Sequence, residues 1–306
     1  MSVPFEIIIN KVPFSTICTV ASLSPIDNKS VLGLVNDFED GKWRYEKFQN
    51  YIWDNLQETA LSLRERQALY GNPMSLLKKA SQKLKLVENA GEEKGGEIAE
   101  ALLYGVMKDY YGAISAVPKI YYKQNSQDPA KGADSVHVVI ESEDSFSLWH
   151  GEAKFYNNIE DARLYKIVES VHDICETANI KKENSIITDV RDLDLIEMNE
   201  SLRTKIKSLL DDDISIDKIK PILHIPIMLL YECPLTETQN EWSPEYVDNV
   251  IAFQKDRANS YFKKQINKCK DVSKYSEIKF HLVLFPVPKK EKILEDFRKH
   301  AEFLRG

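Results

Sequence analysis

The spacing of apolar and polar residues divides the chain into alternating helices and strands. Short apolar runs bounded by turn residues predict strands at 5–10, 115–123, 134–141, 146–156, 184–188, 222–231 and 278–285. Apolar residues at helical spacing predict helices at 31–68 (broken at Asp40-Gly41), 74–90, 97–111, 159–178, 198–210, 246–270 and 289–304. The order helix, three strands, helix, strand that starts at residue 97 predicts an α/β fold with a mixed sheet flanked by helices.

A glycine-rich segment, GEEKGG at 91–96, predicts a hinge between two regions. We expect residues 1–90 to form an N-terminal accessory region that is mostly helical. Residues 91–306 are then the main domain, which ends in basic helices. A chain of 306 residues is long enough for one large domain or two small ones.

Charge is spread unevenly along the chain. The 48 acidic residues outnumber the 41 basic ones and give a formal charge of −7, but the segment 255–305 holds 14 Lys or Arg against 7 Asp or Glu. Such a run is most often a solvated helix face. A basic patch nevertheless attracts a phosphate backbone even on an acidic protein, so the net charge does not exclude nucleic acid as a partner.

Several classes of protein are excluded by what the sequence lacks. Its four cysteines are far apart, which fits neither a disulfide framework nor a CxxC zinc pair. We find no signal peptide, no apolar run long enough to span a bilayer and no GxxxxGK[ST] phosphate loop. We therefore expect a soluble cytoplasmic protein in which any ATP-driven movement comes from another chain.

The segment LWHGEAKF at 148–155 separates chemical from apolar side chains. Residues alternate across a strand, so Glu152 and Lys154 project from the same face, about 6.6 Å apart. If 134–141 and 146–155 form an antiparallel hairpin, the start of the first strand lies beside the end of the second. Asp134 then converges with Glu152 and Lys154.

These side chains suit a divalent cation. The carboxylates of Asp134 and Glu152, the carbonyl oxygen of Ala153 and water would satisfy an octahedral Mg²⁺ or Mn²⁺. Such an ion polarises a phosphodiester, and Lys154 would hold or help deprotonate the attacking water and stabilise the charge that develops on phosphorus. Glu97, in the first turn of the preceding helix, could supply a further metal ligand, and Glu100 one turn on is the reserve candidate.

A Glu-x-Lys triplet alone is weak support, because the chain contains three, namely Glu92/Lys94, Glu152/Lys154 and Glu277/Lys279. Only the middle one ends an apolar strand that follows an Asp-headed strand. The alternative interpretation is a salt-bridged surface hairpin with Asp134 as a turn residue. His150 shares the strand face of Glu152, but a lone histidine there is more typical of a packed side chain.

Gly132-Ala133-Asp134 followed by Gly151-Glu152-Ala153-Lys154 resembles the PD-(D/E)xK nuclease superfamily, in the variant where Gly-x-Asp replaces Pro-Asp. The longer block at 96–156 (GEIAEALLYGVM, AVPKIYYK, GADSVHVVIE, LWHGEAKFY) resembles the HamA family, the nuclease-like subunit of the Hachiman anti-phage defence system. The resemblance implies a restriction-endonuclease-like core and a Mg²⁺-dependent DNase that works with the helicase HamB. It also implies Asp134, Glu152 and Lys154 as the catalytic set, with Glu97 matching the helix glutamate of many relatives.

One departure from the superfamily pattern affects the helix after the motif. Some relatives carry Gln-x-x-x-Tyr there, whereas this chain has Ala162-Arg163-Leu164-Tyr165. The RecB-like subgroup is therefore not matched, and Arg163 or Lys166 becomes a candidate for phosphate contacts. Two other functions stay open: a catalytically silent subunit that docks DNA or the helicase, and a nuclease that acts on RNA.

Overall fold

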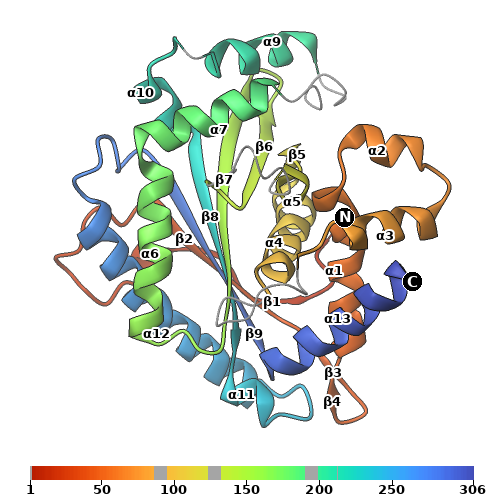
Figure 1. Ribbon diagram of the computed structural model, residues 1–306. Coiled ribbons are helices and arrows are strands. Elements are labelled where there is room, and N and C mark those ends of the chain that lie inside the picture. Colours follow the sequence, from red (N-terminus) through yellow and green to blue (C-terminus); the bar gives the residue numbers. More distant parts are fainter. Residues whose placement is uncertain (1, 86–94, 123–131, 190–198, 212) are drawn as a thin grey trace.

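A mixed sheet of seven strands runs through the molecule between two layers of helices (Figure 1). This computed structural model describes residues 2–85, 95–122, 132–189, 199–211 and 213–306. The strand order is β1 (Glu6–Pro13), β2 (Lys29–Val35), β9 (Lys279–Val287), β8 (Leu223–Glu232), β7 (Ser145–Tyr156), β6 (Ser135–Ser142), β5 (Ile114–Val117). Strands β2, β9, β8 and β7 are parallel, and the strands outside them pair antiparallel. A small hairpin, β3 (Phe38–Glu39) and β4 (Lys42–Trp43), lies apart from the sheet.

Each face of the sheet has its own set of helices. One face packs against α6 (Asp161–Cys175), α7 (Thr177–Asp189) and α12 (Pro244–Cys269), and the other against α1 (Tyr45–Ala60), α3 (Pro73–Gln82), α4 (Gly96–Tyr111) and α13 (Lys290–Arg305). The shorter helices are η1 (Phe14–Thr16), α2 (Leu63–Ala68), α5 (Lys119–Tyr122), α9 (Glu200–Leu209), α10 (Ile216–Ile219), η2 (Lys220–Ile222) and α11 (Pro234–Glu237). None of the described helices is both long and apolar enough to cross a bilayer.

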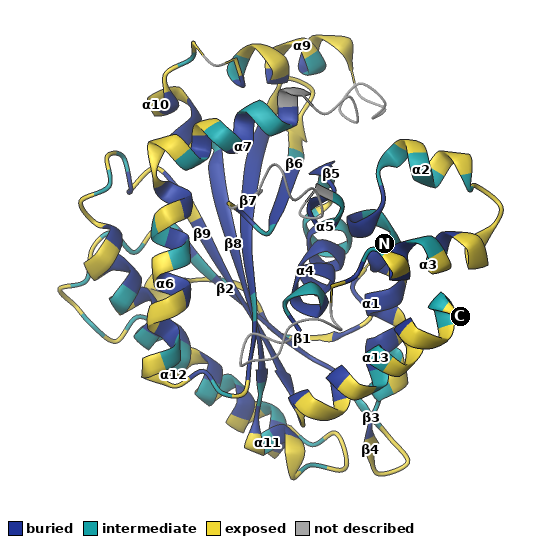
Figure 2. Ribbon diagram, in the orientation of Figure 1, coloured by how far each residue is buried: buried dark blue, intermediate teal, exposed yellow. Residues whose placement is uncertain are grey.

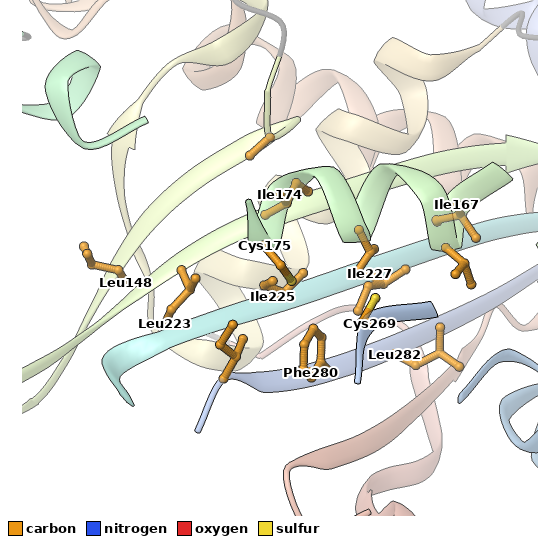
Figure 3. Packing of buried hydrophobic residues seen from close by; sticks show 14 of the residues in the cluster. Leu148, Ile167, Ile174, Cys175, Leu223, Ile225, Ile227, Cys269, Phe280 and Leu282 are labelled. Carbon is orange, nitrogen blue, oxygen red and sulfur yellow. The ribbon is translucent and has the colours of Figure 1, made fainter. Parts of the chain in front are cut away.

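Both faces of the central strands are buried, as Figure 2 shows. In β8, Ile225 and Ile227 belong to the core beneath α6, whereas Met228 and Leu230 belong to the core beneath α4. Figure 3 shows the first of these cores, with the α6 helix lying over β8. A strand covered on both faces reads as a continuous apolar run, which is why 222–231 is recognisable from sequence.

Most elements lie where the sequence predicts them. The strands at 5–10, 134–141, 146–156, 222–231 and 278–285 and the helices at 97–111, 198–210, 246–270 and 289–304 are confirmed within a few residues. The helix predicted at 159–178 divides near Glu176 into α6 and α7. The helix predicted at 74–90 matches α3 as far as Gln82, and its last residues and most of the 91–96 hinge lie outside the described residues.

Three predictions are wrong in part. In the helix predicted at 31–68, residues 31–35 are strand instead, because this short apolar run is buried between β1 and β9, and periodicity alone does not separate a short buried strand from a helix. The β3–β4 hairpin follows, with its turn at Asp40 and Gly41, both at positive φ, so the helix begins only at Tyr45. Residues 184–188 are helical, within α7. The strand predicted at 115–123 ends at Val117, and α5 follows.

The N-terminal region is less helical than expected. It supplies β1 and β2 to the same sheet as the rest of the chain, and β2 pairs with β9 from the C-terminal part. The division at residue 90 stays a prediction.

A buried ion pair holds the chain at the start of β6. Lys119 Nζ of α5 lies 2.5 Å from Glu183 Oε2 of α7, and the two side chains are 2% and 3% exposed. The other oxygen of Glu183 accepts a hydrogen bond from the Ala133 N–H at 3.0 Å. A Cβ on Gly132 would lie 1.9 Å from this oxygen, so only glycine fits there. The pair thus fixes the backbone immediately before Asp134.

Removing one partner of this pair should destabilise the fold strongly. We expect Lys119→Met or Glu183→Gln alone to lower the free energy of unfolding by about 3–5 kcal/mol, because a buried charge then loses its counter-ion. The double variant Lys119→Met/Glu183→Gln should cost less than the sum of the two, because it buries neither charge. Urea denaturation of the four proteins measures this coupling.

The matched control is the ion pair between Lys79 and Glu65, whose nitrogen and oxygen lie 3.0 Å apart but whose side chains are 40% and 22% exposed. Lys79→Met should change stability by less than about 1 kcal/mol. Strictly additive costs for Lys119→Met and Glu183→Gln would contradict the assignment of this pair.

Candidate active site

Strand β7 continues past the point where β6 begins. The last rung of the ladder pairs Ser135 with Gly151, and just before it the Asp134 N–H donates to the Gly151 carbonyl at 2.7 Å. The carboxylate of Asp134 then accepts a hydrogen bond from the Ala153 N–H at 3.0 Å. The predicted antiparallel hairpin is confirmed, and Asp134 lies beside the part of β7 that extends past its ladder with β6.

The three predicted side chains meet at this part of β7. Lys154 Nζ lies 2.7 Å from Glu152 Oε1 and 3.9 Å from Asp134 Oδ2, so one ammonium group reaches both carboxylates. Glu152 is only 4% exposed. A salt-bridged surface face, the alternative interpretation, does not account for a glutamate buried this deeply.

The charges at the site shift the pKa values of Glu152 and Lys154. Burial and the negative charge of Asp134 raise the pKa of Glu152 to about 7, against the opposing effect of Lys154. Burial lowers the pKa of Lys154, but the charges of Asp134 and Glu152 outweigh it and raise that pKa above its ordinary value. Near neutral pH, Lys154 is therefore charged while Glu152 is close to its titration point.

A cavity of about 190 Å³ opens beside these residues. It is lined by Asp134, Lys154, Arg163, Lys166 and Glu100, together with Gly96, Ala153, Phe155, Tyr156 and Asn157. Arg163 and Lys166, both on α6, thus face the same space as Asp134 and Lys154, whereas Glu152 is not among the lining residues. Glu100 brings a second helix, α4, to the cavity.

Glu97 does not occupy the place expected of it. Its carboxylate accepts a hydrogen bond from the Lys85 N–H at 2.9 Å, and Glu97 is not among the residues that line the cavity. Glu100, the reserve candidate, lies there instead. Helix geometry turns two residues that are three positions apart by about 60° around the axis, which is enough to separate the side chains.

The N-terminus of α4 comes close to β7 because it begins with glycine. Gly95 has φ +92°, and a Cβ there would lie 2.9 Å from the Phe155 ring and 2.7 Å from Leu294. This close contact brings the first turn of α4, and with it Glu100, to the end of β7.

The donor chemistry of the site fits a hard divalent cation. Carboxylate oxygens are the ligands that Mg²⁺ and Mn²⁺ prefer, and a cation between Asp134 and Glu152 would relieve the repulsion that raises the pKa of Glu152. In the part of the chain that the structure describes, no three His, Cys, Asp or Glu side chains cluster to hold an ion by themselves. The site therefore suits Mg²⁺, which usually binds one or two carboxylates and completes its shell with water and substrate phosphates.

One residue that supports the site, Glu183, carries no recognisable sequence signal. It lies on a helix 50 residues beyond Ala133, and nothing in the segment around it marks it as part of a site. Only the tertiary fold brings it to the backbone beside Asp134. His150, in contrast, is the packed residue that we expected: it is fully buried, and burial lowers its pKa to about 4.

The raised pKa of Glu152 predicts a pH dependence of stability. The folded carboxyl titrates near 7 and the unfolded one near 4.5, so between these values the folded protein keeps a proton that the unfolded chain has lost. Relative to Glu152→Gln, the free energy of unfolding of the wild type should be highest below pH 4.5 and should fall by a few kcal/mol as the pH rises to about 7. Urea denaturation across this interval, without divalent cations, measures the difference.

Asp134→Asn is the matched variant for this titration. It removes the neighbouring negative charge and so lowers the folded pKa of Glu152, while the unfolded pKa is unchanged. The fall in stability should therefore be smaller and should end at a lower pH. A difference between wild type and Glu152→Gln that does not change with pH would show that Glu152 titrates normally.

Comparison with known proteins extends the resemblance to the HamA family beyond residues 96–156. A sequence model of the HamA family matches residues 13–301 of the 306 residues. No curated protein and no solved structure matches the chain. The matched region contains every residue that lines the cavity beside Asp134 and Lys154. The chain therefore belongs to the HamA family, which gives it a role in Hachiman anti-phage defence.

Proposed function

We propose that this protein is a Mg²⁺- or Mn²⁺-dependent deoxyribonuclease that hydrolyses DNA phosphodiesters in concert with a helicase partner, HamB. The observation that carries the proposal is the convergence of Asp134, Glu152 and Lys154 at the open edge of β7, beside a cavity that Arg163 and Lys166 also line. This convergence supports the interpretation of the fold as a PD-(D/E)xK core. The HamA family assignment supports the defence setting.

Asp134 and Glu152 would hold the cation in this mechanism. When bound, the ion would polarise the scissile phosphodiester and ease the deprotonation of water. The charged form of the buried Glu152 is poorly solvated, because water does not reach its carboxylate. A cation would supply the missing stabilisation, so burial makes this carboxylate a stronger ligand. A bound cation would therefore favour the charged form of Glu152 over the protonated form.

Lys154 acts as a fixed positive charge. Its raised pKa keeps it protonated at neutral pH, so it cannot act as the general base. Its ammonium group orients the attacking water and stabilises the negative charge that accumulates on the phosphate oxygens. The sequence left open whether Lys154 holds the attacking water or helps to deprotonate it, and the raised pKa favours holding it.

The α6 residues Arg163 and Lys166 would bind the DNA backbone. Guanidinium and ammonium groups that face the same cavity as Asp134 and Lys154 suit the phosphates on either side of the cut. Such contacts carry no sequence information, so we expect cleavage with little base preference. They do not separate DNA from RNA, and competition between the two substrates tests the RNA alternative.

A second candidate function is a catalytically silent subunit that docks DNA or the helicase through its basic C-terminal region. The segment 255–305 has the required surplus of positive charge. The buried Glu152 weighs against this function, because burying a carboxylate is costly unless it serves the chemistry of the site.

Cleavage assays test the proposal directly. Purified protein, with and without the helicase, is incubated with plasmid and linear DNA in Mg²⁺. We expect Glu152→Ala and Lys154→Ala each to lower the cleavage rate by about 100-fold or more, because each removes a group that stabilises the transition state. Glu277→Gln, in another Glu-x-Lys triplet of the chain, is the matched control and should cleave like the wild type.

The alternatives predict other results. Unchanged cleavage by both alanine variants would overturn the assignment of the site. DNA binding without Mg²⁺-dependent cleavage, with or without the helicase, would instead support the silent docking subunit.

Substitution of Arg163 or Lys166 on α6 should affect DNA affinity more than the rate of the cleavage step. Arg163→Ala and Lys166→Ala should each weaken DNA binding at low salt and reduce the slope of log affinity against log salt by about 0.9 for each phosphate that the variant no longer neutralises. Lys218→Ala, an exposed lysine of α10 near the start of β8, is the control and should leave both quantities unchanged. Unaltered salt dependence in the α6 variants would show that DNA does not cross this cavity.

A further inference from the structure

A second and larger cavity lies at the other end of α4. Its volume is about 450 Å³, within the range of small-molecule sites. The first turn of α4 lines the active-site cavity through Gly96 and Glu100, whereas its last residue, Tyr111, lines the second cavity. A helix of 16 residues spans about 24 Å, so the two cavities are separate sites.

The floor of the second cavity is a surface of flat rings. Trp149 stacks on His281 with their centroids 4.5 Å apart and an angle of 19° between the rings, and the His224 ring lies beside that of His281, with centroids 5.1 Å apart and 27° between the planes. All three side chains lie on neighbouring strands and are almost fully buried. Tyr111 packs against the Trp149 ring at 4.8 Å and widens this surface. Rings held in this way present a rigid floor to a planar ligand.

The two histidines are linked into a hydrogen-bonded chain. Ser30 Oγ lies 2.8 Å from His281 Nδ1, and His281 Nε2 lies 3.1 Å from His224 Nδ1. Burial and the nearby lysines lower the pKa of His224 to about 3, so the imidazole is neutral and carries one donor and one acceptor. The chain of Ser30, His281 and His224 can therefore donate a hydrogen bond at one end and accept one at the other. The edge of a nucleobase offers the complementary donors and acceptors.

Two lysines and two carboxylates form the rim. Lys11 and Lys279 line the cavity from β1 and β9, and Asp27 and Glu141 lie on the same rim. Lys11 has φ +46°, which is a strained conformation for a residue with a side chain, at an irregularity of the β1–β2 ladder. This conformation places its ammonium group over the Tyr111 ring, 5.3 Å from the centroid.

We propose that this cavity binds a nucleotide, with the base against the floor formed by Trp149, His224 and His281 and the phosphate between Lys11 and Lys279. The carboxylates of Asp27 and Glu141 then suit the sugar hydroxyls, as acidic residues do in other nucleotide sites. The positive charges of Lys11 and Lys279 both lie close to the imidazoles of His224 and His281. A phosphate between the two lysines would neutralise these charges. The proposal does not depend on nuclease activity.

Calorimetric titration of the full chain with adenosine 5′-monophosphate tests it, with adenosine and inorganic phosphate as partial probes. We expect the nucleotide to bind at least about tenfold more tightly than either part, because the ring floor and the lysines each contribute. The imidazole resonances of His224 and His281 should shift in the same titration. These shifts report on the floor of the cavity itself.

Variants locate the binding. Lys11→Gln and Lys279→Gln should each weaken nucleotide binding by about tenfold and leave adenosine binding unchanged, because each removes one charge-assisted contact to phosphate. Lys218→Gln is the surface control and should bind like the wild type.

Three results would overturn the proposal. One is no heat and no imidazole shift at millimolar nucleotide. Another is a loss of binding in Lys166→Gln but not in Lys279→Gln, which would place the ligand in the active-site cavity. The third is equal affinity for the nucleotide and for inorganic phosphate, because the ring floor would then contribute nothing.

Discussion

The last rung of the β6–β7 ladder is the contact on which the site depends. Asp134 donates its N–H to Gly151 and accepts the Ala153 N–H through its carboxylate, so the aspartate is held on both sides of Glu152. One backbone contact and one side-chain contact thereby set the register between the two strands. A slip of one residue would move Glu152 and Lys154 to the opposite face of the sheet.

The support for this contact comes from far along the chain. The ion pair of Lys119 and Glu183 holds Ala133 from one side, and α4 approaches the end of β7 through Gly95 from the other. The result is a carboxylate pair that repels itself in the absence of a cation. Such an arrangement lowers stability, and a bound ion and its substrate would recover that loss.

The alternation of residues within single segments was enough to predict much of the site. Features that depend on contacts with residues far along the chain could not be predicted. Alternation in LWHGEAKF placed Glu152 and Lys154 on one face, and an antiparallel pairing of the strands predicted at 134–141 and 146–156 placed Asp134 beside them. Residues 31–35, in contrast, form a strand only because β9, which lies far along the chain, pairs with them. Glu183 reaches the site only through the tertiary packing of α7. The ring floor of the second cavity assembles from three strands, so no single segment of sequence contains it.

The central claim is that Asp134 and Glu152 together hold a divalent cation beside Lys154. The most direct measurement is an anomalous difference map from crystals of the full chain soaked in Mn²⁺. The account predicts one peak within coordination distance of both carboxylates, which disappears in crystals of Asp134→Asn. A peak elsewhere, or none at millimolar Mn²⁺, would contradict it.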